Sequence, residues 1–313
     1  MKKCLIPLAI IAACALTQFI AGCGDGGAAS DAKVSVLTSD RLPVRTAQPE
    51  QVGGPVEDNG PTTTDGPTQP PGEPGTFTGR IVFEGTAPSQ TLLVRQGDPT
   101  VKDAVCRGFN IPDLSLVVND GGVANVLIYL DEAPSGAKFE PATEPIVFDQ
   151  KGCKFVPRVL LVRTGQPVKM TNTDGTSHNT HTFPARPRNP SFNQTIAPNN
   201  TTGIEYVYQD AEKQPVEVKC DIHAWMKAFH LPLDHPFAAL SDDEGRFEIA
   251  GLPPGRYKFR IWHETAGFLE RSYSVTIKSG ETHDAGDISF AESKFASYNG
   301  PQPKQVLVSA RDQ

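Results

Sequence analysis

The sequence predicts an all-β protein, and three observations lead to this prediction. Its 313 residues include 28 glycines and 28 prolines, and so many turn-forming residues are incompatible with a helical bundle or a coiled coil. Beyond residue 76 the apolar residues recur in short runs with a period of two, which is typical of half-buried strands. No stretch of ordinary helix length repeats its apolar residues with the helical period. We therefore expect several short strands to form a sandwich or a small barrel.

Charge and hydropathy exclude two classes of function. The chain has 36 acidic and 29 basic residues and a net charge of −7, so it has no basic field to hold nucleic acid or anionic lipid. Only one apolar run, near the start of the chain, has a length that approaches a membrane span. A nucleic-acid-binding protein and a multi-span membrane protein are therefore set aside.

The first residues predict export. A positive segment at residues 1–3 and an apolar run over residues 5–20 precede the sequence Ile-Ala-Gly-Cys at 20–23, which is the pattern of a secretory signal. This segment resembles the lipobox of bacterial lipoproteins, which implies that residues 1–22 are a signal peptide and that the sulfur of Cys23 carries lipid. An ordinary signal peptide with an incidental Cys is the alternative. Gly24 after the Cys favours, by the same resemblance, the outer membrane of the cell envelope, facing the periplasm or the cell surface.

A linker is expected between the lipidated Cys and the first strand, over residues 23–75. Its second half, residues 51–75, holds six glycines and six prolines, and its only aliphatic side chains are Val52 and Val56. Such a segment cannot bury enough apolar surface to offset its ordering entropy. We expect a disordered spacer that lifts the folded part off the membrane. A second flexible segment, the tail, is expected over residues 293–313.

Seven runs in the first part of the folded region are predicted to be strands, because each is short and is bounded by Gly or Pro. They cover residues 78–83, 114–118, 123–130, 159–163, 166–172, 205–208 and 216–220. In the last of these, Cys220 falls on the same face as Val216 and Val218. Its sulfur is therefore expected to point into the sandwich.

Two later segments carry side chains that bind metals: Thr-Ser-His-Asn-Thr-His-Thr-Phe at 176–183 and Lys-Cys-Asp-Ile-His-Ala-Trp-Met at 219–226. In the second, Cys220, His223 and Met226 are spaced three residues apart and form a soft ligand set. One more His, from the first segment, would give two imidazoles and a thiolate in a plane, with a weak axial thioether. That donor set is typical of a blue-copper electron-transfer site. A copper ion would also supply the positive charge that keeps a buried thiolate deprotonated.

Both segments resemble those of cupredoxins, particularly amicyanin- and plastocyanin-like ones. The resemblance covers residues 159–231 well and 76–158 poorly. It implies a Greek-key sandwich, which we place at residues 76–236, with one type 1 copper ion. Ligation by His178, Cys220, His223 and Met226 is implied, with Asn179 joining the two ligand loops by hydrogen bonds. Whether residues 76–158 complete this domain or pair with the C-terminal strands is left open.

Several alternatives accompany this interpretation. Zinc also binds Cys and His, although Met is a poor zinc ligand. His181 could replace His178 as a ligand, but it lacks the following Asn, so we expect it beside the ligands or at the surface. Trp225 either covers the copper edge or packs in the core. His230 and His235 are expected in a solvated turn, and a further metal site there lacks a third ligand.

The chain has six cysteines, of which Cys4 and Cys14 are lost with the signal peptide. Two then remain once Cys23 is lipidated and Cys220 binds copper. In an oxidising compartment we expect Cys106 and Cys153 to form a disulfide. Such a bridge would contribute on the order of 4 kcal/mol by the chain-entropy model.

Within residues 240–290, the stretch 246–261 predicts a hairpin with one buried and one wet face. Phe247 and Ile249 alternate with charged residues before a Leu-Pro-Pro-Gly turn at 252–255, and Tyr257 and Phe259 alternate with charged residues after it. This region resembles the carboxypeptidase regulatory-like, or prealbumin-like, modules of secreted bacterial proteins. The resemblance implies a small β-sandwich segment with a structural role, which we place at residues 237–292. It rests on Gly245, Phe247, Ile249, Gly251, Leu252, Pro253, Gly255, Tyr257 and Phe259.

The cupredoxin and lipobox resemblances together imply a membrane-anchored type 1 copper protein that carries single electrons between redox proteins of the cell envelope. No acid/base pair, nucleophile–base pair or phosphate loop is recognisable, so neither an enzyme nor a small-molecule substrate is expected. The 7 histidines cannot easily supply the additional centres of a multicopper enzyme. The alternative function is a non-redox surface or structural module for adhesion, scaffolding or copper storage.

Overall fold

The computed structural model describes residues 72–135, 137 and 139–295. The signal peptide, Cys23, nearly all of the expected linker and the chain beyond residue 295 lie outside the described residues. The all-β prediction is confirmed: the described residues form strands β1 to β20, one 3-10 turn and one four-residue helix. No helix among them is long and apolar enough to cross a bilayer.

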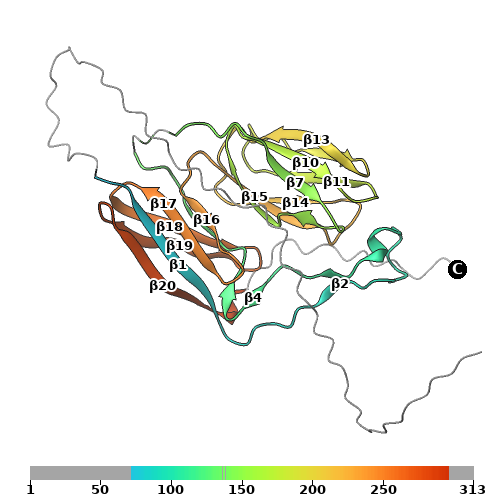
Figure 1. Ribbon diagram of the computed structural model, residues 1–313, viewed down its shortest axis with the longest axis horizontal. Coiled ribbons are helices and arrows are strands. Elements are labelled where there is room, and N and C mark those ends of the chain that lie inside the picture. The colour runs from blue at the N-terminus through green and yellow to red at the C-terminus, as the bar shows by residue number, and fades with distance from the viewer. Residues whose placement is uncertain (1–71, 136, 138, 296–313) are drawn as a thin grey trace, which may run out of the picture. The chain divides into compact units, whose positions relative to one another are not determined.

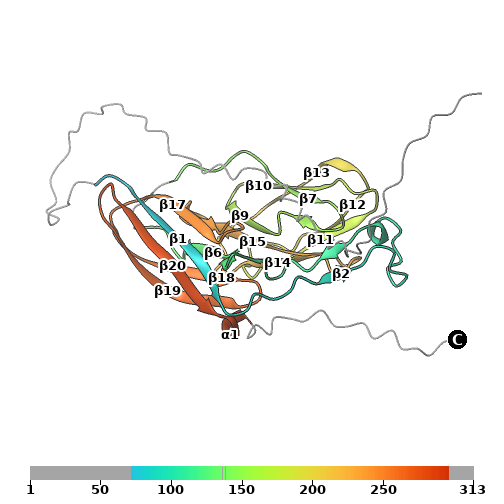
Figure 2. The ribbon, with the colours of Figure 1, turned by 60° about the horizontal axis from the view of Figure 1, so that its bottom comes forward.

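The first sandwich joins the start of the described chain to its end. Strand β1 pairs antiparallel with β17 and parallel with β20, and the three lie side by side in both views (Figures 1 and 2). This sheet comprises β1 (Gly75–Glu84), β4 (Val118–Asn119), β5 (Gly122–Val123), β17 (Arg246–Leu252) and β20 (Thr282–Ala291). The facing sheet comprises β6 (Leu127–Leu130), β16 (Ala238–Leu240), β18 (Gly255–His263) and β19 (Gly267–Ile277).

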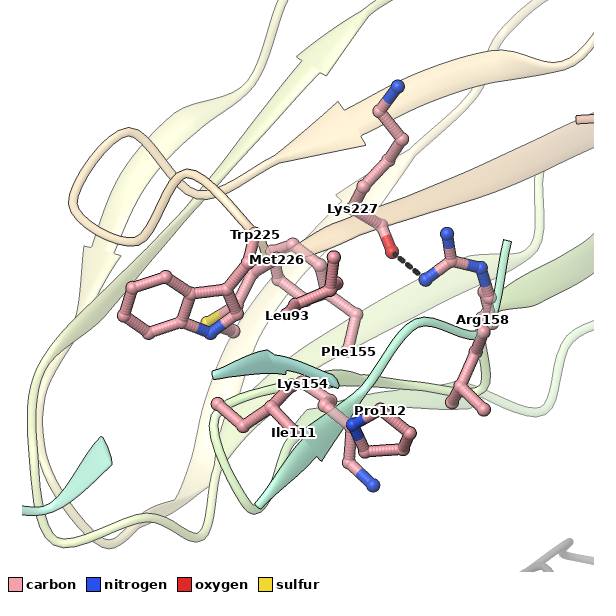
Figure 3. A pocket seen from close by; sticks show the side chains of 10 residues that line it. Leu93, Ile111, Pro112, Lys154, Phe155, Arg158, Trp225, Met226 and Lys227 are labelled. Atoms are coloured by element: carbon pink, nitrogen blue, oxygen red, sulfur yellow. Dashed lines mark hydrogen bonds between the residues drawn. The ribbon is translucent and has the colours of Figure 1, made fainter. Parts of the chain in front are cut away.

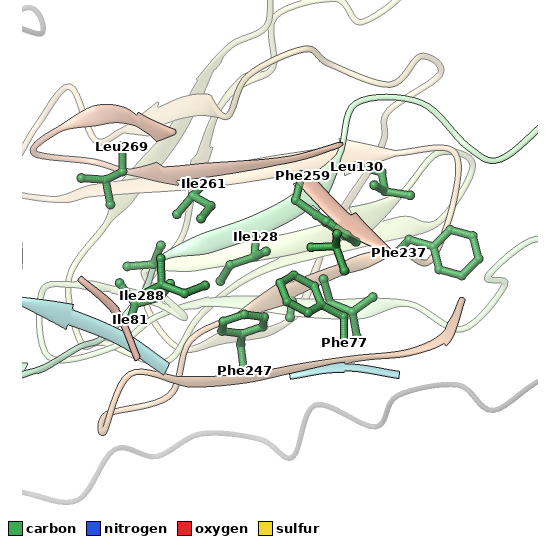
Figure 4. Packing of buried hydrophobic residues seen from close by; sticks show 14 of the residues in the cluster. Phe77, Ile81, Ile128, Leu130, Phe237, Phe247, Phe259, Ile261, Leu269 and Ile288 are labelled. Carbon is green, nitrogen blue, oxygen red and sulfur yellow. The ribbon is translucent and has the colours of Figure 1, made fainter. Parts of the chain in front are cut away.

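Aromatic and branched side chains fill the space between these two sheets (Figure 4). The rings of Phe77 and Phe247 meet edge to face with their centroids 5.1 Å apart, and Phe77 also packs against Phe259 of the facing sheet at 4.8 Å. Phe247 and Ile249 are buried, whereas the charged residues between and beside them are exposed. The period of two in the sequence therefore selects the buried face of β17 correctly.

The predicted hairpin at residues 246–261 is wrong. Its two strands exist, but β17 pairs with β1 and β18 pairs with β6 and β19, so the strands belong to different sheets. The Leu-Pro-Pro-Gly turn carries the chain from one layer to the other, and Gly251 enters it with a positive φ of 76°, which glycine adopts without strain. A boundary at residue 236 therefore does not follow the sheets, because β1 and β6 both pair with strands of the C-terminal segment.

The second sandwich holds the segments with the metal-binding side chains. One of its sheets comprises β9 (Val159–Arg163), β11 (His178–Phe183), β12 (Asn193–Ile196), β14 (Val216–Lys219) and β15 (Lys227–Leu233). The other comprises β7 (Ile146–Gln150), β8 (Phe155–Val156), β10 (Pro167–Asn172) and β13 (Asn200–Val207). Phe148, Met170 and Val218 are fully buried between them. Two pairings are parallel, β10 with β7 and β15 with β9, and the others are antiparallel.

An excursion of the chain between β1 and β4 packs against this second sandwich. Residues 92–112, here called the strap, contain the paired strands β2 (Leu92–Val94) and β3 (Ile111–Pro112) and the 3-10 turn η1 (Cys106–Gly108). The strap buries Val94, Val101, Cys106 and Ile111 in the core of the second sandwich. It therefore brings residues from the poorly matched part of the sequence next to the ligand segments.

The two sandwiches share a third apolar layer. Leu127, Tyr129 and Trp262 pack against Phe229 and other residues of β9 and β15, and the Phe229 and Trp262 ring centroids are 5.0 Å apart. All four residues of β6 are buried, because one face of the strand meets this layer and the other meets the core of the first sandwich. This explains why β6 is a continuous apolar run rather than an alternating one.

The start of the expected flexible tail is ordered. A short helix, α1 (Glu292–Phe295), follows β20. Phe295 is buried and packs against Phe83 and His263, with ring centroids 5.2 and 5.5 Å away. Residues 293–295 therefore belong to the first sandwich, because the Phe295 ring completes one end of its core.

Candidate metal centre

Two neighbouring strands position two of the four expected ligands, and the loop that follows the second strand carries the other two. His178 is the first residue of β11, and Cys220 directly follows β14, which pairs antiparallel with β11. The loop from Cys220 to Met226 connects β14 to β15. It is closed by two backbone bonds: Cys220 N donates to Met226 O at 3.2 Å and Met226 N donates to His223 O at 2.9 Å. The short spacing of the motif thus returns His223 and Met226 towards Cys220.

The structure brings the two expected imidazoles and the thiol into contact. The Nδ1 atoms of His178 and His223 lie 2.8 Å apart, and the Sγ atom of Cys220 lies 3.8 Å from Nδ1 of His223. All three side chains are buried, and Cys220 is a free thiol. Met226 is 1% exposed and lies in the same core cluster. Because the two Nδ1 atoms face each other, only one of them can carry a proton. A bound cation could accept the lone pairs of both nitrogens, so this arrangement suits a cation.

Neighbouring groups favour the thiolate and an imidazolium in the metal-free protein. Burial raises the pKa of Cys220, but hydrogen bonds from His178 and His223 outweigh it and lower this pKa to about 6. Burial lowers the pKa of His178, but hydrogen bonds to Asp174 and Cys220 outweigh it and raise this pKa to about 9. Between these values a negative sulfur faces a positive ring. A bound cation could take the place of that proton.

His178 is held from its far side by Asp174. Its Nε2 atom lies 2.9 Å from Oδ2 of Asp174, and that carboxylate accepts hydrogen bonds from the backbone N–H groups of Gly152 at 2.6 Å and Cys153 at 2.7 Å. Burial raises the pKa of Asp174, but these bonds outweigh it and hold the pKa below its usual value. A proton on Nε2 leaves Nδ1 available as a ligand. No motif in the sequence assigns Asp174 a role, although its place four residues before His178 is a usable signal.

Asn179 joins the two ligand segments. Its side-chain amide donates to Asp221 Oδ2 at 2.9 Å and its oxygen accepts from the backbone N–H of Asp221 at 2.6 Å. His181 lies apart from the ligand cluster and is partly exposed, with Nδ1 3.0 Å from Oδ2 of Asp221. His178, and not His181, therefore contacts the ring of His223.

Trp225 lies over the ligand loop. Its ring centroid is 5.1 Å from that of His223, and its Nε1–H donates to the carbonyl oxygen of Cys153 at 3.1 Å. Trp225 and Met226 line a shallow pocket together with Leu93 and Ile111 of the strap (Figure 3). Trp225 thus covers one edge of the ligand cluster and also packs against the core.

The expected solvated turn around His230 and His235 is wrong, since both residues are buried. Nδ1 of His230 lies 3.0 Å from the hydroxyl of Tyr208, and its ring meets Phe148 edge to face at 4.4 Å. Burial lowers the pKa of His230 to about 3. His230 is thus a neutral core residue of β15. This strand is not among those predicted from the sequence, so the burial of His230 was not expected.

The predicted disulfide is confirmed. Cys106 and Cys153 are bonded and fully buried, and Sγ of Cys106 lies 3.7 Å from Nε2 of His223. Among the described residues, groups of at least three metal-binding side chains occur around His178, and both groups include one of these half-cystines. Neither group includes Cys220, whose sulfur lies 3.8 Å from Nδ1 of His223. A disulfide sulfur is not a thiolate, so the free thiol of Cys220 is the sulfur here that can bind a metal as an anion.

Comparison with known proteins gives limited similarity. The chain matches no family model and no curated protein. One similar solved structure is a Cu-containing nitrite reductase from Thermus scotoductus SA-01, with 21% identity and a TM-score of 0.25, matched over 33% of this chain and 25% of that chain. Another is a reduced variant of amicyanin, with 18% identity and a TM-score of 0.25, over 34% of this chain and 91% of that chain. A third is a purple cupredoxin from Nitrosopumilus maritimus, with 16% identity and a TM-score of 0.23, over 28% of this chain and 98% of that chain.

These similar structures are cupredoxins, but each is matched over about a third of this chain or less. At such identities and TM-scores they add no weight to any functional argument.

Proposed function

We propose that this protein is a type 1 copper protein that carries single electrons between redox proteins of the cell envelope. The observation that carries the proposal is the 2.8 Å approach of two imidazole Nδ1 atoms beside the buried thiol of Cys220. His178, His223 and Cys220 would hold the ion, and Met226 would be the weak axial ligand. When bound, copper supplies one-electron chemistry between its two oxidation states.

The donor set favours copper over zinc. Two imidazoles, a thiolate and a thioether are soft to intermediate donors, which suit copper. Zinc would take the same Cys and His side chains but gains little from the buried sulfur of Met226. The lowered pKa of Cys220, about 6, means that the thiolate is available near neutral pH without displacement of a tightly held proton.

The surrounding residues suit an electron carrier because they restrict ligand movement. The two ligand segments are joined by strand pairing of β11 with β14 and by the Asn179–Asp221 bonds. Close packing around buried ligands limits rearrangement when the charge of the ion changes. In this proposal the protein is not an enzyme and takes no small-molecule substrate; it needs only the close approach of a redox partner.

The membrane part of the proposal rests on the sequence alone. Lipidation of Cys23 would tether the folded part through the Gly- and Pro-rich linker to the outer membrane. Labelling of growing cells with a lipid precursor, followed by Cys23→Ala, tests it. If the variant still carries the label, the anchor is not at Cys23.

Visible and electron paramagnetic resonance spectroscopy of the copper-loaded full chain test the copper centre. One copper per chain with a strong absorption at about 600 nm, from thiolate-to-copper charge transfer, is expected. Cys220→Ser should abolish that band, whereas His181→Gln should retain it, since His181 does not contact the cluster. Stoichiometric copper without the band would favour copper storage, and a chain that binds no copper would favour a structural module.

A further inference from the structure

His178 and His223 face each other through their Nδ1 atoms, and each has a carboxylate near its other ring nitrogen, Nε2, here called the remote nitrogen. The two carboxylates come from different parts of the chain. Asp174, which faces His178, belongs to the same segment as that ligand. The carboxylate near His223 comes from the strap: Oδ2 of Asp103 lies 3.7 Å from Nε2 of His223. The strap precedes the well-matched segment by about fifty residues of sequence, and sequence analysis gave Asp103 no role.

Asp103 is held in place on both sides. Its Oδ1 atom accepts the backbone N–H groups of Val105 and Cys106, both at 2.9 Å. Its Oδ2 atom accepts the hydroxyl of Thr176 at 2.5 Å, and Thr176 lies two residues before His178. A carboxylate with this many donors keeps one orientation. Asp103 therefore links the strap to the first ligand segment while it faces the second imidazole.

The disulfide fastens the strap to the second sandwich at the ligand cluster. The backbone N–H of Cys106 donates to Asp103, and that of Cys153 donates to Asp174. One covalent bridge thus joins the two peptide units that orient the two carboxylates. With the strap in this position the side chain of His223 is only 3% exposed, and Leu93 and Ile111 lie against Trp225 and Met226 (Figure 3).

We propose that Asp103 is a positioning residue for His223, and that the disulfide holds it there by fastening the strap over this side of the metal centre. This inference rests on the proposed function. At 3.7 Å the carboxylate of Asp103 is beyond hydrogen-bond distance, so it acts on the ring through its charge. A negative group beside the nitrogen that faces away from the ion makes an imidazole a better ligand. Its negative charge stabilises the divalent ion more than the monovalent one. Asp103 would thus set the affinity for Cu(II) and the reduction potential without touching the ion.

The direct test is Asp103→Asn in the full chain, with Asp98→Asn as the matched control. Asp98 lies on the same strap, but its carboxylate bonds to Thr100. For Asp103→Asn we expect Cu(II) binding, measured by competition with a chelator, to weaken by about 10–100-fold. A tenfold loss confined to Cu(II) raises the reduction potential by about 59 mV in voltammetry. Asp98→Asn should match the wild type in both, and an Asp103→Asn protein that also matches it would overturn the inference.

The double variant Cys106→Ala/Cys153→Ala tests the role of the disulfide. If the bridge holds Asp103 in place, the double variant should show the same direction of change in affinity and potential. Adding Asp103→Asn to it should then have little further effect, because the two changes act through one contact. Fully additive changes would show that Asp103 and the disulfide act separately, which contradicts the proposal. Circular dichroism excludes loss of the fold.

A measurement on the metal-free protein separates this inference from the proposed function. Cys220 is the free cysteine of the described residues, and it is buried in the core cluster to which the strap contributes, so alkylation of its thiol reports opening of this region. Loss of a charged hydrogen-bonding group should make that opening easier and alkylation faster by about tenfold in Asp103→Asn. An unchanged alkylation rate would refute the proposed role of Asp103 in holding the strap, even if copper binds. Faster alkylation in a protein that shows no type 1 copper spectrum would support the role of Asp103 in holding the strap. The same result would reject the proposed electron-carrier function.

Discussion

Arg158 offers the sharpest test of how the two sandwiches depend on each other. It lies just before β9, and its Nε and Nη2 atoms donate to the two carboxylate oxygens of Glu264 at 2.5 and 2.6 Å. The side chains of Arg158 and Glu264 are 15% and 5% exposed. The third guanidinium nitrogen, Nη1, lies 3.4 Å from the carbonyl oxygen of Lys227, one residue beyond Met226 (Figure 3). The pair therefore ties the turn after β18 to the end of the ligand loop.

Replacement of Arg158 by Met should lower the free energy of unfolding by about 3–5 kcal/mol, because it leaves the carboxylate of Glu264 buried without a cation. The penalty should depend on pH. Burial raises the pKa of Glu264 from its usual 4.5, and Arg158 opposes that rise. A group whose pKa is raised on folding loses stabilisation as the pH rises through its folded value. Without Arg158 the rise is larger, so the penalty should be greater at pH 8 than at pH 5.

Urea unfolding of the metal-free full chain at these two pH values measures the effect. Arg188→Met is the matched control: it removes a pair with Asp210 in which Arg188 is 71% exposed, and should cost less than about 1 kcal/mol. Arg158→Met/Glu264→Leu should recover most of the loss, because no buried charge remains. The reasoning is refuted if Arg158→Met costs no more than Arg188→Met, or if its cost is the same at both pH values.

Three further predictions follow from the described contacts. Burial lowers the pKa of His230 and of His263 to about 3; because the unfolded rings titrate near 6.5, each contributes stability that is present above that pH and is lost by up to about 1.4 kcal/mol per unit as the pH falls towards 3. Urea midpoints between pH 7 and pH 4 should therefore fall less steeply in His230→Phe than in the wild type, and an equal slope contradicts the assignment. Cys106→Ala/Cys153→Ala should lower the free energy of unfolding by about 4 kcal/mol by chain entropy; an unchanged urea midpoint would show that core packing alone holds the strap. Met226→Leu should raise the reduction potential and leave one copper per chain, since a hydrocarbon replaces a weak axial donor; voltammetry that finds no shift would exclude axial ligation.

The sequence predicts local features of this fold well and pairing poorly. The period of two identifies the buried faces of β1, β17 and β18, because alternation is a property of each strand by itself. It does not identify partners: the N-terminal β1 pairs with β20, whose first residue comes about two hundred positions later. Partners are chosen by the packing of whole sheets, which a period does not encode. The hairpin expected at residues 246–261 failed for this reason.

The candidate metal centre likewise has one part that the sequence predicts and one part that it does not. Cys220, His223 and Met226 lie in one loop, so their spacing alone places them together, and the family pattern supplied His178. The sequence contains neither a spacing nor a family pattern that singles out Asp103. Its approach to His223 exists only because the strap docks on a sandwich built from later residues. The disulfide predicted from cysteine arithmetic is the one feature of the sequence that indicates this link between the two regions.

The C-terminal segment, for which the resemblance implies only a structural role, borders the ligand loop. Strand β15 starts at Lys227, one residue after Met226, and its Phe229 packs on Trp262 of β18. Arg158, held by Glu264, donates to the backbone at Lys227. The loop is thus bounded by the strap on one side and, at its exit, by a strand packed on the first sandwich. Because ligand geometry depends on both boundaries, residues outside the segment 159–231 would contribute to the properties of the proposed copper ion.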